Sequence, residues 1–424
     1  MRTWRSPEMR GLVFYDDARA RTFEPFALSR PLSEMRVGAP LLRERWEHAS
    51  MSSHKSAFVS SSHLANFSEA DRCLLAPEVL QSGTVLINSR AAIALDVDDI
   101  FDELPTANVI NALTIAGELA ALHLNVDVPR AWLSDGSLSL RALAEQLQIV
   151  VCAVEVDGVW LNEVWDITRH LTPLLNADIP ALVKRHNLTE YVPVLFDTIA
   201  ISSRDRVWYE PGAVIEPHTF FDTSAGPVLI RKGATVQAFT RVVGPCYIGP
   251  DSIVGGDRVA ACSIGDNCRV HGEISNSVLV GHSNKGHDGF VGHSILGRWV
   301  NLGAGTTTSN LKNTYGTVAL WTRDGLRDTG LQFLGTLFGD HVKTGVGLML
   351  TTGCVLGMGA NVFERMPPKV VEPFAWGSAA PYDTYELSRF VETAERMMSR
   401  RHVELTDAMR ASLIEIHAAR WRAT

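Results

Sequence analysis

The sequence has few cysteines, no long hydrophobic run and no excess of positive charge. Six cysteines in 424 residues are too sparse for a disulfide scaffold, and they lack the paired spacing of zinc sites. No segment approaches the roughly 18 apolar residues of a membrane-spanning helix, and the N-terminus lacks a secretory apolar run of about 7 to 15 residues. The net charge of −8 argues against nucleic-acid binding. We therefore expect a cytoplasmic protein without nucleic-acid or membrane partners.

The composition is that of an ordinary globular protein. Hydrophobic residues make up 46% of the chain and charged residues 20%, so two or three domains with ample core are expected. A local basic cluster remains compatible with the negative balance. Small phosphorylated molecules are therefore the expected ligands.

Aliphatic residues recur every six positions through the second half of the chain, often followed by glycine. One inward aliphatic residue per six is typical of a parallel β-helix, in which three such units form one coil and glycine relieves the corners. An antiparallel β domain with many glycine turns is disfavoured, because alternation with period two is missing where period six is strong. The repeating positions are Ile230, Val236, Val242, Ile248, Val254, Ile264, Val270, Leu296, Leu302, Phe338, Thr344, Leu350, Leu356 and Val362.

The pattern divides the chain into three parts. Residues 1–203 mix apolar strands with a helical stretch and predict a Rossmann-like α/β domain; the expected strands are Leu12–Tyr15, Ala57–Ser60, Thr84–Asn88 and Gln148–Val154, and the expected helix is Leu138–Gln148. Residues 207–368 carry the hexapeptide repeats of a left-handed parallel β-helix, broken at 310–330 by a projecting loop. In residues 381–424, amphipathic helices are expected to cap the coil or form a subunit contact.

A turn inside the repeats carries candidate catalytic groups. His287 stands between Lys285 and Asp288, and Asn301 with the Gly303–Gly305 loop follows. Imidazole can remove the proton that an amine must lose before it attacks an acyl thioester. The Asn301 amide or the backbone N–H groups of the loop could then stabilise the charge on the carbonyl oxygen.

At these residues the chain resembles the bifunctional enzymes that are both glucosamine-1-phosphate N-acetyltransferase and N-acetylglucosamine-1-phosphate uridylyltransferase. In that family a G-H turn precedes an N-[IL]-G-A-G-T motif by fourteen residues, and Gly286-His287 precedes Asn301 to Thr306 at the same distance. The resemblance implies that His287 is the base and that Asn310 binds the sugar. It also implies that Arg241, in an F-x-R element, binds the sugar phosphate.

The same resemblance implies a homotrimer with acetyl-coenzyme A bound between subunits. Gly303 and Ala304 would frame the thioester, and Lys285 would contact the substrate. Two positions depart from the family: Phe290 replaces a sugar-contacting tyrosine, and Val346 replaces a serine near the thioester. Acceptor or donor preference is therefore expected to differ.

The N-terminal part resembles the same family's nucleotidyltransferase domain less closely. Its opening keeps two prolines but loses the glycines and a lysine, Asp16 and Asp17 would repel a triphosphate, and Arg90 stands where the family has a Mg²⁺-binding aspartate. The segment from Arg30 to Gly38 resembles a divergent branch with an R-P-x-x-E-x-R-x-G opening. Three arginines could instead clamp phosphates: Arg21, Arg30 and Arg36. Mg²⁺ is expected if the domain is active, with ligands left unassigned.

We therefore expect an acetyl-coenzyme A-dependent N-acetyltransferase acting on an amino-sugar 1-phosphate, coupled to a divergent uridylyltransferase-like domain that supplies UDP-N-acetylglucosamine for the cell envelope. One alternative is a sugar-phosphate nucleotidyltransferase with a structural β-helix. Another is a zinc enzyme of the β-helix carbonic anhydrase type, using His282, His287 and His293 from neighbouring subunits. A catalytically silent scaffold is the third alternative.

Overall fold

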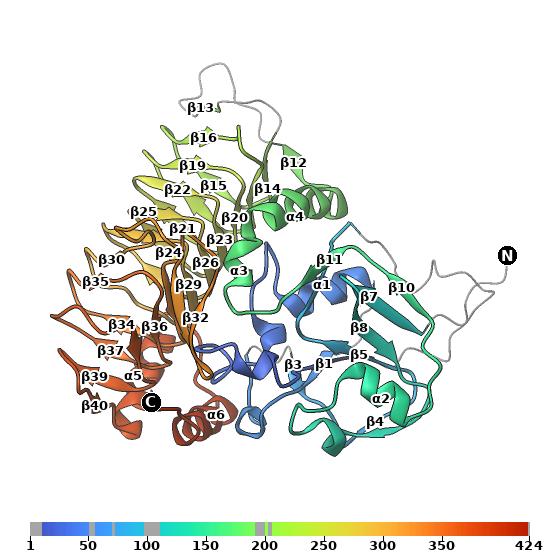
Figure 1. Ribbon diagram of the computed structural model, residues 1–424. Helices are drawn as coiled ribbons and strands as arrows, with labels where there is room; N and C mark the ends of the chain where they lie inside the picture. Colours follow the sequence, from blue (N-terminus) through green and yellow to red (C-terminus); the bar gives the residue numbers. More distant parts are fainter. Residues whose placement is uncertain are drawn as a thin grey trace.

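The computed structural model describes residues 11–50, 56–69, 73–96, 111–190, 200–201 and 206–422. It contains an α/β domain that lies against one side of a long three-sided coil, with two helices at the far end of the coil (Figure 1). The predicted combination of an α/β domain, a parallel β-helix and C-terminal helices is therefore confirmed. Among the described residues, no helix combines the length and the apolar run that crossing a bilayer requires.

The first side of the coil is a sheet whose neighbouring coil strands run parallel, with β12 (Thr189–Glu190) antiparallel at its start. Its coil strands are β14 (Val207–Tyr209), β17 (Val228–Ile230), β20 (Cys246–Ile248), β23 (Ser263–Asp266), β26 (Val278–Gly281), β29 (Ile295–Arg298), β33 (Thr336–Phe338), β36 (Cys354–Leu356) and β38 (Val370–Val371).

The second side follows the first along the chain in each coil. Its strands are β15 (Val214–Ile215), β18 (Thr235–Val236), β21 (Ile253–Gly255), β24 (Arg269–His271), β27 (Asn284–Lys285), β34 (Lys343–Thr344), β37 (Asn361–Val362), β39 (Ala375–Gly377) and the antiparallel β40 (Asp383–Thr384). Single bridges through Asn301 join β27 to β34. This side therefore extends beyond residue 368, because Pro367 and Pro368 lie outside the strands and remove no ladder donor.

The third side completes each coil. Its strands are β13 (Ala200–Ile201), β16 (Phe220–Asp222), β19 (Arg241–Val243), β22 (Arg258–Ala260), β25 (Glu273–Ser275), β28 (Phe290–Gly292), β30 (Thr307–Thr308) and β35 (Met349–Leu350). We call the turns from first to second side, second to third and third to first the first, second and third corners.

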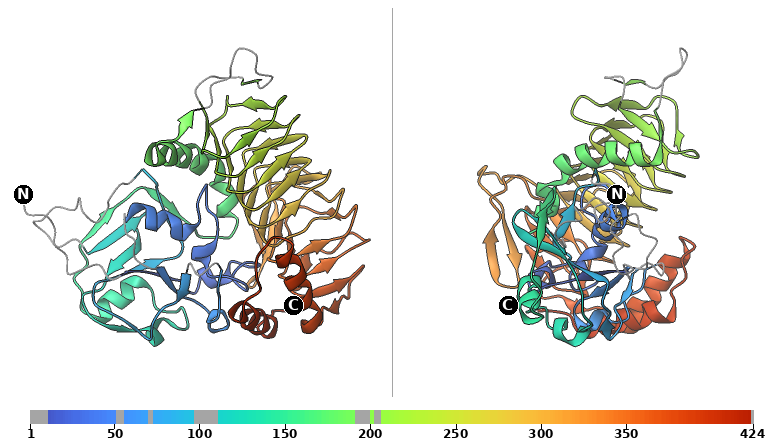
Figure 2. Two further views of the ribbon diagram at one scale, coloured as in Figure 1. Left: turned by 180° about the vertical axis from the view of Figure 1, so that it is seen from behind. Right: turned by 90° about the vertical axis from the view of Figure 1, so that its right-hand side faces the viewer.

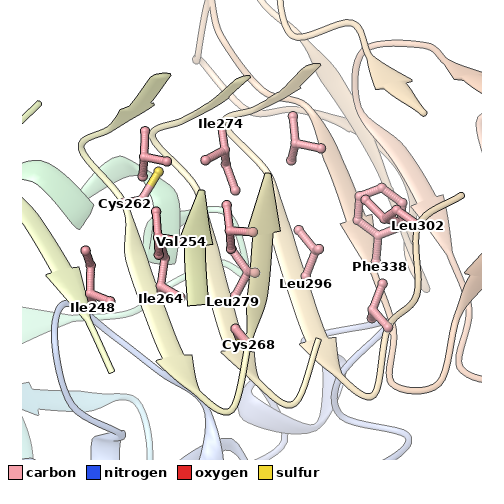
Figure 3. Packing of buried hydrophobic residues seen from close by; sticks show 14 of the residues in the cluster. Ile248, Val254, Cys262, Ile264, Cys268, Ile274, Leu279, Leu296, Leu302 and Phe338 are labelled. Atoms are coloured by element: carbon pink, nitrogen blue, oxygen red, sulfur yellow. The ribbon is translucent and has the colours of Figure 1, made fainter. Parts of the chain in front are cut away.

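The interior of the coil is filled by the periodic residues, as Figure 3 shows for a column that runs from Ile248 to Phe338. The breaks in the six-residue count arise because some units have five residues, as between Val254, Val259 and Ile264, all of which are buried. Four cysteines also occupy this interior: Cys246, Cys262, Cys268 and Cys354.

The α/β domain is built on a seven-stranded mixed sheet of order β10-β7-β8-β5-β1-β2-β3, in which β1 is parallel to both neighbours. These strands are β1 (Gly11–Tyr15), β2 (Ser56–Val59), β3 (Cys73–Leu75), β5 (Thr84–Asn88), β7 (Ala112–Ile115), β8 (Glu118–His123) and β10 (Ala153–Glu155). Two small ladders join β4 (Val79–Leu80) to β9 (Val128–Pro129) and β6 (Ala91–Ile93) to β11 (Gly158–Trp160). The predicted strand at Gln148–Val154 begins later, at Ala153.

The helices of this domain are α1 (Leu42–Ala49), α2 (Leu140–Gln146), α3 (Asp166–Arg169) and α4 (Leu171–His186), with 3-10 turns η1 (Ala20–Thr22), η2 (Leu32–Glu34), η3 (Ser62–Leu64) and η4 (Arg130–Leu133). The predicted helix at Leu138–Gln148 is α2, which begins where the Ser139 hydroxyl accepts a hydrogen bond from the Ala142 N–H.

The domain covers the outer face of the first side of the coil (Figures 1 and 2). Met35 and Val37 share one apolar cluster with Val278, Ile295 and Leu337 of the coil. Polar groups cross the same contact, since the Ser263 hydroxyl donates to the Gly38 carbonyl at 2.6 Å. The two parts therefore form one continuous body.

The segment predicted as a loop at 310–330 forms an antiparallel hairpin of β31 (Ala319–Thr322) and β32 (Gly325–Asp328). The segment leaves the coil sheets as predicted, but part of it is strand rather than loop, and its Val318 and Leu320 are buried in the apolar cluster shared with the α/β domain. At the coil end, α5 (Leu387–Ser399) and α6 (Asp407–Ala418) occupy the predicted helical region. Helix α5 packs Phe390 on Phe374 of the coil, whereas α6 contacts η3 of the α/β domain.

Candidate functional site

The predicted base lies on the turn between β27 and β28, at the second corner. The His287 side chain is exposed. Its backbone is fixed, because Lys285 Nζ donates to the carbonyls of His287 and His271 at 2.5 and 2.7 Å. The Gly305 N–H donates to the Asp288 carbonyl at 2.9 Å. An exposed imidazole on a hydrogen-bonded turn is thus open to solvent at this corner.

Lys285 lies inside the coil rather than on its surface. Its register partner is Val270, a residue of the buried column, and Lys285 is itself 1% exposed. Burial disfavours the charged ammonium and lowers the pKa of Lys285 to about 8. The structure places this predicted substrate contact underneath the turn, where it ties two successive coils together.

The second corner brings several predicted residues together. The loop from Gly303 to Thr306 stacks on the His287 turn one coil later, and it approaches so closely that a Cβ on Gly289 would lie 2.3 Å from the Thr306 carbonyl oxygen. The Ala304 carbonyl then accepts from the Gly347 N–H at 2.7 Å. Val346, beside Gly347, is 78% exposed. His287, the Gly303–Thr306 loop and Val346 therefore share one edge of the coil.

His271 was missed by sequence reasoning. It occupies the same corner one coil earlier, and its Nδ1 lies 3.5 Å from an Asp288 carboxylate oxygen. The available signal was its position in the repeat, one coil before the Lys285-Gly286-His287 turn. A second imidazole therefore lies next to the His287 turn.

The outer face of the third side carries a row of residues in strand register. Arg241, Arg258, Glu273 and Phe290 occupy successive strands. Strands about 4.8 Å apart put Arg241 about 14 Å from Phe290 and Arg258 about 10 Å from it. Arg241 pairs with Asp222 at 2.8 Å and stacks over the Phe220 ring.

Arg258 is thus nearer to the His287 turn than the predicted phosphate ligand Arg241. Its Nη1 lies 3.5 Å from Glu273, and both side chains are substantially exposed. Sequence reasoning missed Arg258 because the F-x-R motif pointed to Arg241. Counting coils instead of residues would have found it.

Phe290 and Asn310 converge at the third side. A Cβ on Gly292 would lie 2.5 Å from the Phe290 ring and 2.6 Å from Asn310 Nδ2, so glycine makes room for both side chains. Asn310 Nδ2 is 2.9 Å from Nδ1 of His293, which stacks on Phe333. Burial lowers the pKa of His293 to about 4, so a neutral imidazole accepts the amide hydrogen at neutral pH.

Asn301 faces the second side. Its Oδ1 accepts a hydrogen bond from Asn284 Nδ2 at 2.7 Å, and both amides line a cavity beneath α5. Asn301, which was predicted to contact the oxyanion, therefore lies on the second side of the coil, and this side adjoins the corner that carries His287.

The three histidines of the zinc alternative lie at three different corners. His282 follows β26, His287 follows β27 and His293 follows β28. Within the described part of this one chain, no three histidine, cysteine or acidic side chains are grouped as metal ligands. One chain therefore does not assemble that site.

In the α/β domain, the ends of the parallel strands β1 and β5 carry a paired charge. Asp17 accepts from Arg90 at 2.9 Å and from Asn88 Nδ2 at 2.9 Å. Asp16 is buried, which raises the pKa of its carboxyl group, and it accepts from the Ser60 hydroxyl at 2.6 Å. This strand edge is where open α/β sheets bind ligands.

The three arginines predicted to clamp a nucleotide are engaged separately. Arg21 donates to the carbonyls of Asp16, Leu133 and Ser134. Arg30 is 1% exposed and pairs with Glu69 and with Asp340 of the coil, and Arg36 lies buried over the Tyr247 ring. The structure therefore does not bring the three guanidinium groups to a common point.

Comparisons with known proteins match a family model to the α/β domain and find relatives that are named as bifunctional enzymes. Residues 12–187 match the family model described as sugar nucleotidyl transferase. The bifunctional protein GlmU of Rippkaea orientalis is 29% identical over 183 residues, which cover 38% of this chain and 38% of that protein. The bifunctional sugar-1-phosphate nucleotidylyltransferase/acetyltransferase of Sulfurisphaera tokodaii is 30% identical over 150 residues, covering 32% and 35%.

The GlmU of a Nostoc species is 28% identical over 195 residues, covering 41% of this chain and 40% of that protein. The chain thus spans less than half the length of these relatives. A solved structure of a mutant AntD, an N-acyltransferase from Bacillus cereus, in complex with dTDP and coenzyme A, covers 48% of this chain and 90% of its own at 10% identity and a TM-score of 0.16. The sequence matches confirm the resemblance inferred from the motifs.

Proposed function

We propose, from the premise that this chain is a divergent GlmU-like protein, that it is a transferase which acylates the amino group of a sugar phosphate. Acetyl-coenzyme A is the proposed donor and glucosamine 1-phosphate the proposed acceptor. The α/β domain is proposed to add sugar-1-phosphate nucleotidyl transfer. The cytoplasm, where these substrates would be available, is the proposed location.

One observation carries the acyl-transfer proposal: an exposed His287 imidazole on a turn that is hydrogen-bonded to the coils before and after it. A base must be accessible to the substrate and held in a fixed position. The buried Lys285 ammonium supplies that rigidity without contacting the substrate.

In the proposed reaction His287 takes a proton from the sugar ammonium, and the amine nitrogen attacks the thioester carbonyl carbon. The C–N bond forms, the tetrahedral oxyanion collapses and the C–S bond breaks. His287 returns this proton to the leaving thiolate, and the second proton that the nitrogen must lose to become an amide passes to solvent. Backbone N–H groups of the Gly303–Gly305 loop are the proposed oxyanion donors, and Val346 offers an apolar contact to the donor.

The acceptor is proposed to lie along the third side. Phe290 and Asn310 would contact the sugar, because Gly292 lets their side chains meet beside the His287 turn. Arg241 was the predicted phosphate ligand, and Arg258 offers the same guanidinium chemistry one strand nearer. A homotrimer that completes this site from a neighbouring subunit remains part of the proposal.

Mg²⁺ does not fit the α/β domain at the expected position. Arg90 stands there and is paired with Asp17, whose carboxylate also accepts from Asn88 and from the Ala20 N–H. A guanidinium cannot bind a cation, so we derive no step through the metal.

A coupled assay tests both activities. The full chain is supplied with glucosamine 1-phosphate, acetyl-coenzyme A, UTP and Mg²⁺, while free thiol and pyrophosphate are measured separately. Thiol release with pyrophosphate supports both transfers, and thiol alone limits the proposal to acylation. Pyrophosphate formed only when N-acetylglucosamine 1-phosphate is supplied would indicate a nucleotidyltransferase with a structural coil.

A further inference from the structure

A basic cavity lies between the outer face of the second side and helix α5. Its volume is about 670 Å³, and it is lined by residues of the coil from Asn267 to Lys343 and by residues of the helical region from Thr393 to His402. Clefts of about 300 to 1,000 Å³ hold small organic ligands, whereas a single inorganic anion needs far less space. The cavity is therefore large enough for a complete small molecule.

Five cationic side chains line this space, and its lining includes no carboxylate: Arg269, Lys343, Arg396, Arg400 and Arg401. Arg396 pairs with Glu392 outside the cavity. Arg269 donates to the carbonyls of Asp251 and Cys268 at 2.8 and 3.0 Å. Within the described chain, Arg269, Arg400 and Arg401 have no carboxylate partner.

Gathering these charges has an electrostatic cost. Burial, followed by the positive charges of Arg269 and Arg400, lowers the pKa of Arg401. Burial also lowers the pKa of Lys343 to about 8. Like charges held together without counter-charges favour an anionic ligand, because only the ligand removes the repulsion.

The rest of the lining is not basic. His282 lies against Trp299 with ring centroids 4.3 Å apart and the ring planes tilted by 37°, and the amides of Asn284 and Asn301 pair at 2.7 Å. Burial lowers the pKa of His282 to about 4, so its ring is neutral at neutral pH, and both His282 and Trp299 line the cavity with the small part of each ring that is not buried. A ligand that carries both phosphates and a planar ring would match a cavity that is lined by arginines in one part and by aromatic rings and amides in the other.

We propose that the cavity binds a nucleotide or a nucleotide-linked cofactor, with Arg269, Arg400 and Arg401 contacting its phosphates and His282 with Trp299 contacting its ring. The volume, the unpaired arginines and the aromatic pair carry this assignment. Asn284 lies three residues before His287, a separation of at most about 11 Å, so the occupant would reach toward the turn with the exposed imidazole. The proposal does not depend on catalytic activity.

The test is isothermal titration calorimetry of the full chain with three probes: coenzyme A, UDP and pyrophosphate. Arg400→Gln removes one exposed cavity charge near the end of α5. Arg389→Gln is the matched control, since Arg389 lies on the same helix, is 78% exposed at its side chain and does not line the cavity. We expect R400Q to weaken nucleotide binding about 10-fold or more, with R389Q unchanged and affinity falling as salt rises.

Tighter binding of coenzyme A indicates an adenine-linked occupant, and tighter binding of UDP a uridine-linked one; both support the proposal. Failure of all three probes to bind more tightly than about 1 mM would overturn it, as would equal affinities of R400Q and R389Q. If pyrophosphate binds as tightly as both nucleotides, the ring of the ligand adds nothing to affinity, and the assignment of a nucleotide is overturned. His287→Ala should leave this binding unchanged, so failure of acyl transfer and failure of the cavity proposal are separable.

Discussion

His287 combines an exposed side chain with a backbone fixed from both neighbouring coils. This combination separates catalysis from stability at the residue scale, because the imidazole packs on nothing that the fold needs. A substitution there should affect turnover while the turn, held by main-chain carbonyls and N–H groups, keeps its shape.

His287→Ala should lower kcat for acyl transfer by about 10²- to 10⁴-fold, the usual contribution of a positioned base, with acceptor binding nearly unchanged. Steady-state thiol release gives kcat, and calorimetry gives the acceptor Kd. His186→Ala, another exposed histidine on α4, is the control. Equal turnover of the two variants would remove His287 from the mechanism.

Lys285 makes a second prediction, for pH dependence. Its pKa is lowered to about 8 from 10.5 by burial. Between these values the unfolded chain holds a proton that the folded chain has lost, so Lys285 makes the free energy of unfolding rise with pH. From about pH 7.5 to about pH 9.5, the stability of the wild type relative to Lys285→Met should increase by about 2 kcal/mol.

Urea unfolding at both pH values measures this difference. Lys232→Met, at an exposed position on the coil, should show no such trend against the wild type. A constant difference between wild type and K285M would mean that the ammonium is not buried.

At the scale of the strand and turn, the glycines of the coil differ in why they are needed. A Cβ on Gly265 would lie 2.2 Å from the Val280 carbonyl oxygen, so the adjacent coil leaves no room for a side chain. Gly347 has φ +73°, but a Cβ there would meet nothing within 4 Å, so only backbone strain opposes substitution.

Gly265→Ala should therefore reduce the free energy of unfolding by about 3 kcal/mol, and Gly347→Ala by about 1 kcal/mol. Chemical denaturation of both variants provides the comparison. The reverse order would contradict close backbone packing between coils.

The sequence was most informative about the coil and least informative about contacts outside it. Period six identified the interior column, because each coil repeats the same local packing at Ile248, Ile264 and Leu296. It could not show that Lys285 replaces an aliphatic residue of that column, since a lysine in a G-H turn also suits a surface site. Nor could residue spacing show that a five-residue unit puts Arg258 in register with Arg241, one strand nearer to Phe290.

The arginines near the N-terminus were harder to interpret. Their partners, such as Asp340 for Arg30, lie hundreds of residues away in the sequence, and only the docked domain reveals them. The same charges that suit a phosphate also suit a buried ion pair.

For the whole molecule, the contact between the α/β domain and the coil is built from charged as well as apolar groups. Asp340 of the coil accepts from Arg30 Nη2 at 2.6 Å and, through its other oxygen, from the Arg298 N–H at 2.7 Å. Since Arg30 is almost completely buried, it depends on Asp340 and Glu69 for its counter-charge.

Asp340→Asn should lower the free energy of unfolding by about 2 to 4 kcal/mol, because one partner of a buried pair is neutralised. Asp324→Asn, at an exposed carboxylate 3.6 Å from Arg19, should have an effect below about 0.5 kcal/mol. Fluorescence and circular dichroism should follow one transition in the wild type. An unaltered D340N variant would show that the two parts do not stabilise each other through this pair.

The reactivity of the cysteines inside the coil reports on local unfolding of the coil. Burial raises the pKa of Cys262, Cys268 and Cys354 to about 12 and that of Cys246 well above its usual value, and the reactive species is the thiolate. An alkylating reagent can therefore modify these thiols only while the coil around them is locally unfolded. Because they are distributed from early coils to late ones, the order in which they become labelled would reveal from which end the coil unwinds.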